Sequence, residues 1–193
     1  MPKVVDHSER RRELVQASWD VIARDGIEGV TLRNVASAAG CTTGRINHYF
    51  SGREDLLSSA LVAAYDESEQ RMIAVIKTSL PAKERLRRVV YEGLPFDAAR
   101  LKEWKVWIVF WAAAASNPLL AKQNRIRYEG WRRLLLGLLG QIESLSPDSA
   151  ELCVEELLAI IDGLGLRVTL TNTLGNRRMA SRTIDDYIDR IGT

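Results

Sequence analysis

Apolar residues recur along this chain at intervals of three and four positions, which is the spacing of one face of an α-helix. Leu14, Val21 and Ile22 follow this pattern, and Leu57 and Leu61 repeat it further along. No stretch alternates apolar and polar residues as a half-buried β-strand does. The pattern therefore predicts an all-α protein.

Glycines and prolines divide the pattern into about nine helices. Gly40 separates two short segments, while Pro118 and Pro147 follow residues that commonly cap a helix start. The expected helices span residues 8–25, 32–39, 43–49, 53–79, 82–93, 97–116, 118–143, 147–172 and 179–191. The early helices are short and the later ones long and more apolar. We expect a first domain at residues 1–52 and a second at 53–193. Because no flexible linker separates them, we expect a continuous long helix to join the two.

Residues 31–50 contain two short helices separated by a turn at Gly40. This is the arrangement of a helix-turn-helix motif. Thr31 and Thr42 stand where their hydroxyl groups cap the two helices, and Gly40 suits a left-handed backbone in the turn. We expect Ile46 and Phe50 to pack against the helix at 8–25. The opposite face of the second helix is then free.

The free face of that second helix carries side chains that suit the groove of a DNA duplex. Arg45 can donate two hydrogen bonds to guanine, Asn47 can pair with adenine in the same way, and His48 is a third candidate for base contacts. Phosphate contacts or close backbone approach are expected from the flanking Thr31, Arg33, Thr42, Thr43, Gly44, Tyr49 and Arg53.

The spacing of this segment leaves an alternative open. Two short helices around a glycine also form a simple α-hairpin within a helical bundle. Residues 1–55 carry eight basic and eight acidic side chains, so the segment is neutral overall. DNA binding by this segment therefore requires basic and acidic side chains to lie on opposite faces.

The order of residues in this segment resembles the TetR family of bacterial transcriptional repressors. The resemblance rests on the strings Ala39-Gly40-Cys41-Thr42-Thr43-Gly44, His48-Tyr49-Phe50 and Arg53-Glu54-Asp55-Leu56-Leu57. It implies a TetR-like fold, with a DNA-binding helix-turn-helix head at residues 1–52 and an effector-binding and dimerisation bundle at 53–193. It also implies a homodimer that binds double-stranded DNA at a palindromic operator.

Within that family the chain is most similar to the BetI type, the repressors of choline-to-betaine genes. This closer likeness rests on Arg10-Arg11-Arg12, Thr43-Gly44, His48-Tyr49-Phe50, the segment from Trp107 to Phe110-Trp111, and Ile161-Asp162-Gly163-Leu164 with Leu166-Arg167. Three positions depart from the pattern. Asn47 replaces a frequent Tyr, Arg53 replaces Lys, and Gly165 stands where an aromatic residue is common. The last departure predicts an incomplete aromatic cage or a wider pocket.

Aromatic residues recur on one face of the helix expected at 97–116, namely Trp104, Trp107 and Trp111, with Phe110 beside them. Such a stripe usually belongs to the hydrophobic core. The alternative is an effector pocket, shared with Trp131, in which ring faces bind a quaternary ammonium cation. Asp162 or Glu103 can supply the balancing negative charge.

Composition narrows the remaining possibilities. The chain has 193 residues and a formal net charge of +2, so only a local patch can bind nucleic acid. Cys41 and Cys153 lie far apart, and no cluster of metal ligands occurs, so we expect neither a disulfide scaffold nor a metal site. Because the sequence has no phosphate-binding glycine loop and no nucleophile elbow, we expect no cofactor and no enzymatic activity.

The first ten residues contain no apolar segment, so we expect no secretory signal there. The longest uncharged apolar run, residues 106–115, is too short to cross a bilayer. The sequence thus predicts a cytoplasmic protein with no membrane partner. Our first hypothesis is a ligand-responsive transcriptional regulator, a repressor that binds its operator as a dimer and is released by a small molecule. The second is a helical small-molecule binding protein with a vestigial DNA-binding head.

Overall fold

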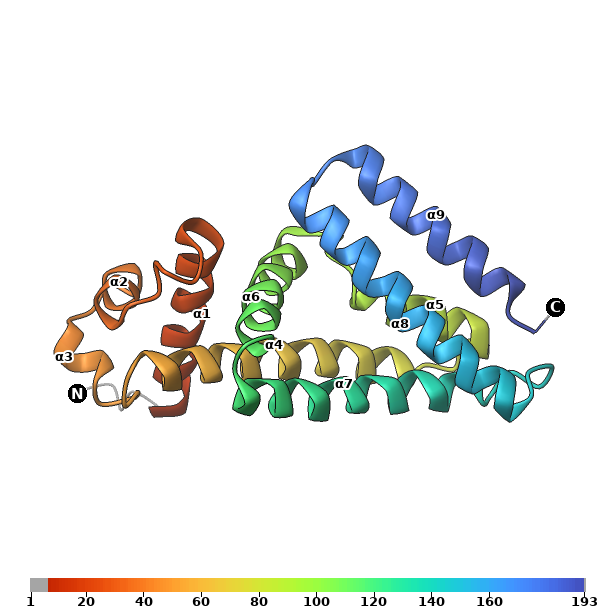
Figure 1. The fold of residues 1–193 in the computed structure, drawn as a ribbon, viewed down its shortest axis with the longest axis horizontal. Helices are drawn as coiled ribbons and strands as arrows, with labels where there is room; N and C mark the ends of the chain where they lie inside the picture. Colours follow the sequence, from red (N-terminus) through yellow and green to blue (C-terminus); the bar gives the residue numbers. More distant parts are fainter. Residues whose placement is uncertain (1–6, 193) are drawn as a thin grey trace.

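The computed structural model describes residues 7–192, apart from the side chain of Leu119. Within this range it has nine helices and no strand (Figure 1), which confirms the expected all-α fold. Residues 1–6, which belong to the segment in which we expected no secretory signal, lie outside the described part. The helices are α1 (His7–Asp25), α2 (Leu32–Ala38), α3 (Thr43–Ile46), α4 (Arg53–Ile76), α5 (Ala82–Glu92), α6 (Ala98–Ala114), α7 (Pro118–Leu139), α8 (Pro147–Leu170) and α9 (Leu174–Arg190).

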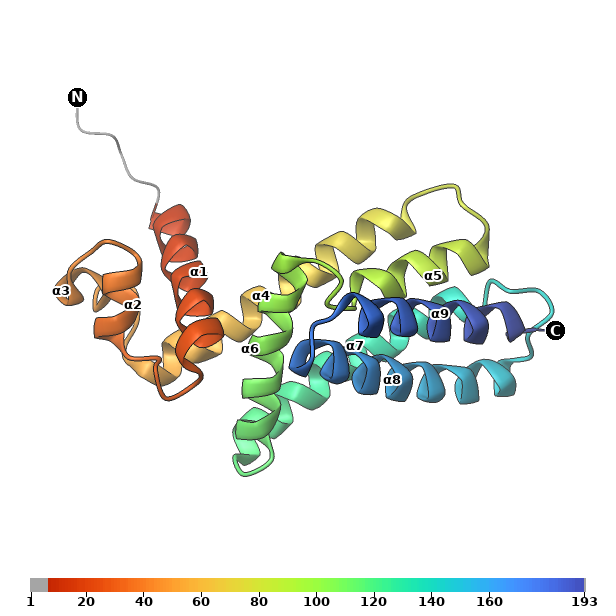
Figure 2. The same ribbon diagram turned by 90° about the horizontal axis from the view of Figure 1, so that it is seen from above.

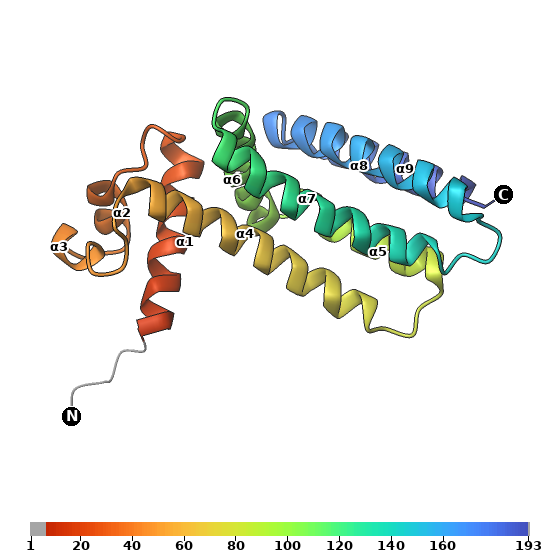
Figure 3. The ribbon, with the colours of Figure 1, turned by 60° about the horizontal axis from the view of Figure 1, so that its bottom comes forward.

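The helices form a small head and a larger body. Helices α1 to α3 gather at one end of the molecule, and the C-terminus lies at the opposite end (Figures 1 and 2). Helix α4 starts in the head and continues into the body, where it packs against α5 and α6. Helices α8 and α9 lie side by side along the body (Figure 1), and α7 runs along α8 (Figure 3). A single continuous helix therefore joins the two parts.

Two helix ends differ from the sequence-based expectation by about four residues or more. Helix α9 begins at Leu174 instead of near residue 179, because the Thr173 hydroxyl accepts a hydrogen bond from the Asn176 backbone N–H at 3.1 Å. That cap starts the helix ahead of Gly175. Helix α7 ends at Leu139 instead of near residue 143, and Gly140 follows its last turn directly.

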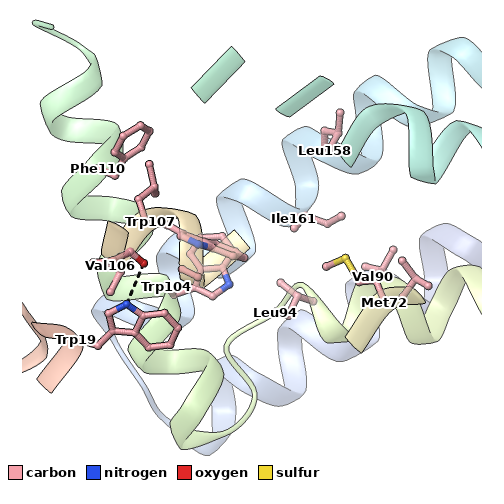
Figure 4. Close-up of a cluster of buried hydrophobic side chains, with 14 of the residues drawn as sticks. Trp19, Met72, Val90, Leu94, Trp104, Val106, Trp107, Phe110, Leu158 and Ile161 are labelled. Carbon is pink, nitrogen blue, oxygen red and sulfur yellow. Dashed lines mark hydrogen bonds between the residues drawn. The ribbon is translucent and has the colours of Figure 1, made fainter. Parts of the chain in front are cut away.

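Helix α1 attaches the head to the body through contacts with both α4 and α6. The indole N–H of Trp19 donates to the Ala60 carbonyl oxygen of α4 at 3.0 Å (Figure 4). Lys105 of α6 donates to the Ala23 carbonyl oxygen near the end of α1 at 2.9 Å, and Lys102 forms an ion pair with Asp20. The helix that carries the tryptophan stripe is thus in direct contact with the head.

The body also buries a charged side chain, Glu103 of α6, which is 2% exposed. Its two carboxylate oxygens accept hydrogen bonds from the guanidinium group of Arg71 in α4, both at 2.7 Å. Arg71 also donates to Glu92 of α5 at 3.2 Å. Removing one partner of such a pair leaves a buried charge uncompensated. The network therefore fixes α4, α5 and α6 relative to one another.

No helix in the described range is both long enough and apolar enough to span a membrane.

Candidate nucleic-acid interface and ligand pocket

The helix-turn-helix segment is held by the local interactions that its sequence predicts. The Thr31 hydroxyl accepts from the Asn34 backbone N–H at 3.1 Å, and the Thr42 hydroxyl accepts from the Arg45 N–H at 3.3 Å. Gly40 has a φ of 63°, a left-handed conformation that costs a glycine little. These caps and this turn fix the angle between α2 and α3.

The two faces of the α3 segment differ in the way we expected. Ile46 and Phe50 are buried against the head, at 0% and 2% exposure. The candidate DNA contacts of this segment are exposed, namely Thr43, Gly44, Arg45, Asn47 and His48. Helix α3 itself ends at Ile46, and residues 47–49 continue as a turn, with the Tyr49 N–H donating to the Ile46 carbonyl oxygen. We call these five exposed residues the polar ridge.

Ion pairs distinguish two groups of charged side chains in the head. Arg33 and Arg45 are exposed and form no ion pair within the described residues. In contrast, Asp20 pairs with Lys102 of the body, and Asp25 pairs with Arg24 of the head. The positive charges of Arg33 and Arg45 are therefore not compensated by an ion pair with a described carboxylate.

Two further candidate contacts are only partly exposed and have neighbours within the head. The Tyr49 ring lies 4.4 Å from the His7 ring, centroid to centroid. Arg53 donates from Nε to the Val30 carbonyl oxygen at 2.8 Å and from Nη2 to the Ile27 carbonyl oxygen at 2.7 Å. Arg53 thus fixes the loop between α1 and α2, a role that the sequence did not indicate.

A cavity of about 420 Å³ lies within the body between α4, α6, α7 and α8. Five of the six candidate effector residues line it, namely Trp104, Trp107, Trp111, Trp131 and Asp162. Phe110 does not line the cavity. Phe110 stands between Trp107 and Trp111 in α6 and is part of the hydrophobic core, at 6% exposure (Figure 4). The aromatic residues of α6 therefore belong both to the hydrophobic core and to the cavity wall. Their two interpretations from the sequence, as core and as pocket, are compatible.

Aromatic rings meet one another around this cavity. The Trp104 ring lies 5.5 Å from both the Trp107 ring and the Trp111 ring, and it meets Trp111 edge to face at 89°. Tyr65 of α4 stacks on Trp107 at 5.8 Å. Burial raises the pKa of Tyr65 to about 12, so its hydroxyl stays neutral at physiological pH. Tyr65 is not among the candidates that the sequence offered, because the packing of α4 against α6 leaves no periodic signal in either segment.

Two glycines provide space for the tryptophan rings. A Cβ atom on Gly165 would lie 1.9 Å from the Trp104 ring, and one on Gly93 would lie 2.8 Å from the Trp131 ring. The Gly93 carbonyl oxygen also accepts a hydrogen bond from the Trp104 indole N–H at 2.8 Å. The space next to Gly165, a position at which we noted that an aromatic residue is common in the BetI type, is thus filled by a ring from α6.

Of the two candidate carboxylates, only Asp162 lines the cavity. Glu103 instead pairs with Arg71. Asp162 accepts a hydrogen bond from the Tyr128 hydroxyl, and burial raises the pKa of Asp162 while this hydrogen bond lowers it. The other charged residues of the lining are Glu69 and Arg127. An aromatic wall with a partly buried carboxylate suits a cationic ligand.

No group of three or more His, Cys, Asp or Glu side chains within residues 7–192 is arranged to hold a metal ion.

Two family models match this chain and together cover most of it. Residues 14–60 match the family model for bacterial regulatory proteins of the tetR family, and residues 82–193 match the C-terminal model of BetI-type transcriptional repressors. The chain belongs to the TetR family. Its C-terminal part is of the BetI type, as the sequence resemblance had indicated.

Full-length TetR-family relatives share the whole architecture. The HTH-type transcriptional regulator BetI of Vibrio atlanticus is 31% identical, over 98% of this chain and 95% of its own length. The regulator PksA of Bacillus subtilis is 29% identical, over 99% and 94%. Among solved structures, a transcriptional regulator of Saccharomonospora viridis, in complex with choline, has a TM-score of 0.86 at 27% identity and covers 95% of this chain and 97% of its own. A Rhodococcus transcriptional regulator has a TM-score of 0.83 at 31% identity, over 94% and 95%.

Proposed function

We propose that this TetR-family regulator binds a palindromic DNA operator as a homodimer and is released from it by a small cationic effector. The observation that carries the proposal is the exposed polar ridge, which faces away from the core while Ile46 and Phe50 are buried behind it. In this scheme residues 1–52 bind DNA and residues 53–193 bind the effector and the second subunit. The protein then works in the cytoplasm as a repressor, and no catalytic step is involved.

The DNA contacts divide into two kinds. Arg45, Asn47 and His48 read base edges in the major groove. Phosphates are held by the residues around them, namely Thr31, Arg33, Thr42, Thr43, Tyr49 and Arg53, while Gly44 allows close backbone approach. The capping hydroxyls of Thr31 and Thr42 accept from backbone N–H groups, so their own hydrogens remain available to donate to phosphate oxygens.

Dimerisation is proposed to use α8 and α9. Large apolar side chains on this side of the body are exposed in the single chain, among them Leu152 at 62%, Leu166 at 40% and Leu170 at 71%. Two copies of the helix pair related by a twofold axis would bury these residues in a four-helix interface. Such a dimer presents two heads to one duplex.

The effector is proposed to be a quaternary ammonium cation held by Trp104, Trp107, Trp111 and Trp131, with Asp162 supplying the opposite charge. Support comes from the aromatic lining, in which each ring face contributes about 0.5–2 kcal/mol to binding a desolvated cation. The choline complex of the Saccharomonospora viridis regulator points to the same chemistry.

Helix α6 connects the effector to the DNA in this scheme. It carries three of the tryptophans that line the cavity, and its Lys102 and Lys105 contact α1 of the head. An effector releases DNA only if it binds more tightly to the conformation whose heads do not fit the operator. We propose that a shift of α6 around the bound cation changes the position of α1, and with it the distance between the two heads.

Binding to a library of random duplexes, titrated with salt, tests the proposal. An operator-binding dimer selects a subset of sequences, and its affinity falls steeply as salt rises, because neutralised phosphates release counterions. Adding choline to the selected complex is expected to release the DNA. A flat, unselective response together with tight choline binding would instead indicate a ligand-binding protein with a vestigial head.

A further inference from the structure

The backbone conformation at Gly165 in α8 does not require a glycine. The residue is buried well inside a 24-residue helix, and its φ does not lie in the left-handed region. Alanine is a better helix former than glycine at such a position. The reason for the glycine is steric, because a Cβ atom would lie 1.9 Å from Cη2 and 2.0 Å from Cζ2 of the Trp104 ring.

The Trp104 ring is not free to yield to a new side chain. It is 1% exposed, and its indole N–H is fixed by the Gly93 carbonyl oxygen at 2.8 Å. The rings of Trp107 and Trp111, which also line the cavity, lie 5.5 Å from it on other sides. A side chain at position 165 would therefore move the ring cluster and change the shape of the cavity wall.

The cavity has room and apolar lining beyond the tryptophan cluster. Val62 of α4 and Ile126 of α7 both line it and are 38% and 58% exposed, so its outer part is apolar and open to solvent. A cation whose ammonium group contacts the tryptophans would extend any apolar substituent toward these two residues. The Trp104 ring, which lies against α8 at Gly165, forms part of the wall of this cavity of about 420 Å³.

We propose that Gly165 is the specificity-determining residue that adapts this pocket to quaternary ammonium ions carrying an apolar substituent, by letting Trp104 lie against the backbone of α8. The proposal rests on the proposed cationic effector. It assigns Gly165 a positioning role, since the residue acts on the ligand through the Trp104 ring.

Calorimetric titration of three cations of increasing size tests the selectivity. The probes are tetramethylammonium, choline and benzyltrimethylammonium, and the proteins are wild type, Gly165→Ala and the control Gly137→Ala. Gly137 is an exposed glycine of α7 around which an added Cβ would meet no atom within 4 Å. In Gly165→Ala we expect affinity for benzyltrimethylammonium to fall about tenfold or more, with a smaller loss for choline and the smallest for tetramethylammonium. The control is expected to match wild type.

A thermal unfolding cycle checks that the effect comes from the contact between Gly165 and Trp104. Gly165→Ala alone is expected to lower Tm by about 3 °C or more. In a Trp104→Leu background, which removes the ring atoms that the new methyl group would meet, the same change is expected to leave Tm unchanged or raise it. Equal losses in both backgrounds would overturn the proposed pairing.

These experiments distinguish a failure of the proposed selectivity from a failure of the proposed cationic effector. If wild type binds the cations and Gly165→Ala weakens all three equally or none of them, the proposed selectivity is wrong and the cationic effector stands. If wild type binds none of the three, the cationic effector itself is contradicted, and the selectivity with it.

Discussion

The two candidate sites of this regulator are built in different ways. In the head, the polar ridge is set by contacts a few residues apart, such as the Thr42 cap on Arg45 and the turn at Gly40. In the body, the cavity wall is set by contacts between distant segments, such as Trp104 against Gly165 and Gly93. One site is fixed by local chain geometry, and the other by packing.

This difference predicts separate consequences for mutation. Side chains of the polar ridge are exposed and contribute little to the core, so their loss is expected to affect DNA binding and spare stability. Side chains of the cavity wall are also core residues, so their loss is expected to affect effector binding and stability together. The following predictions test this contrast.

The largest effect is expected from Trp104→Ala. The substitution removes a ring that contacts Trp107, Trp111 and the backbone at Gly165, and truncating a buried aromatic residue costs about 3–5 kcal/mol in the free energy of unfolding. Urea unfolding measures it. The matched head variant Arg45→Ala is expected to change the same quantity by less than about 0.5 kcal/mol. Similar losses in both variants would show that the two sites do not differ in this way.

Arg45→Ala is expected to act on DNA recognition instead. Loss of a bidentate contact to guanine should remove about 1–3 kcal/mol of discrimination at one base pair of the operator. Arg53→Ala should weaken binding to every sequence and also lower Tm, because Arg53 holds two loop carbonyl oxygens. Competition binding with single-base operator variants distinguishes the two. A uniform loss across all sequences for both variants would contradict the division between base and phosphate contacts.

Asp162→Asn is expected to weaken cation binding on the order of 1–2 kcal/mol and to remove its pH dependence. Burial raises the pKa of Asp162, so the carboxylate is protonated at a higher pH than an exposed one. In wild type, affinity for choline is therefore expected to be full above the raised pKa of Asp162 and to fall as the pH decreases through it. Calorimetric titration at several pH values measures this. A pH profile shared by wild type and Asp162→Asn would assign the charge to another group.

The smallest effect is expected from Thr42→Ala, which removes the cap of α3. Losing such a cap costs about 1 kcal/mol. The variant should bind all DNA sequences somewhat more weakly and leave effector affinity unchanged, whereas Thr42→Ser should retain both. Anisotropy with operator DNA and calorimetry with choline provide the two measurements. A change in effector affinity would indicate that the cap acts beyond the head.

The sequence predicts the head better than the body, because the head depends on contacts between neighbouring residues and the body on packing between distant segments. Caps at Thr31 and Thr42 and the turn at Gly40 depend on neighbours in the chain, so they can be inferred from residue order. The nine helices and the aromatic stripe follow from periodicity. The contribution of Tyr65 to the cavity, the absence of Phe110 from it and the contact between Trp104 and Gly165 depend on how distant helices pack. No local pattern encodes those contacts.

Operator binding by two copies of the polar ridge is tested by a footprint of the wild-type protein on a duplex selected from a random library. We expect two protected half-sites that are related by a twofold axis and centred about 34–36 Å, or a multiple of that distance, apart. Choline is expected to remove the protection. Protection of a single half-site, or of no defined sequence at all, would contradict the claim that two copies of the polar ridge read one operator.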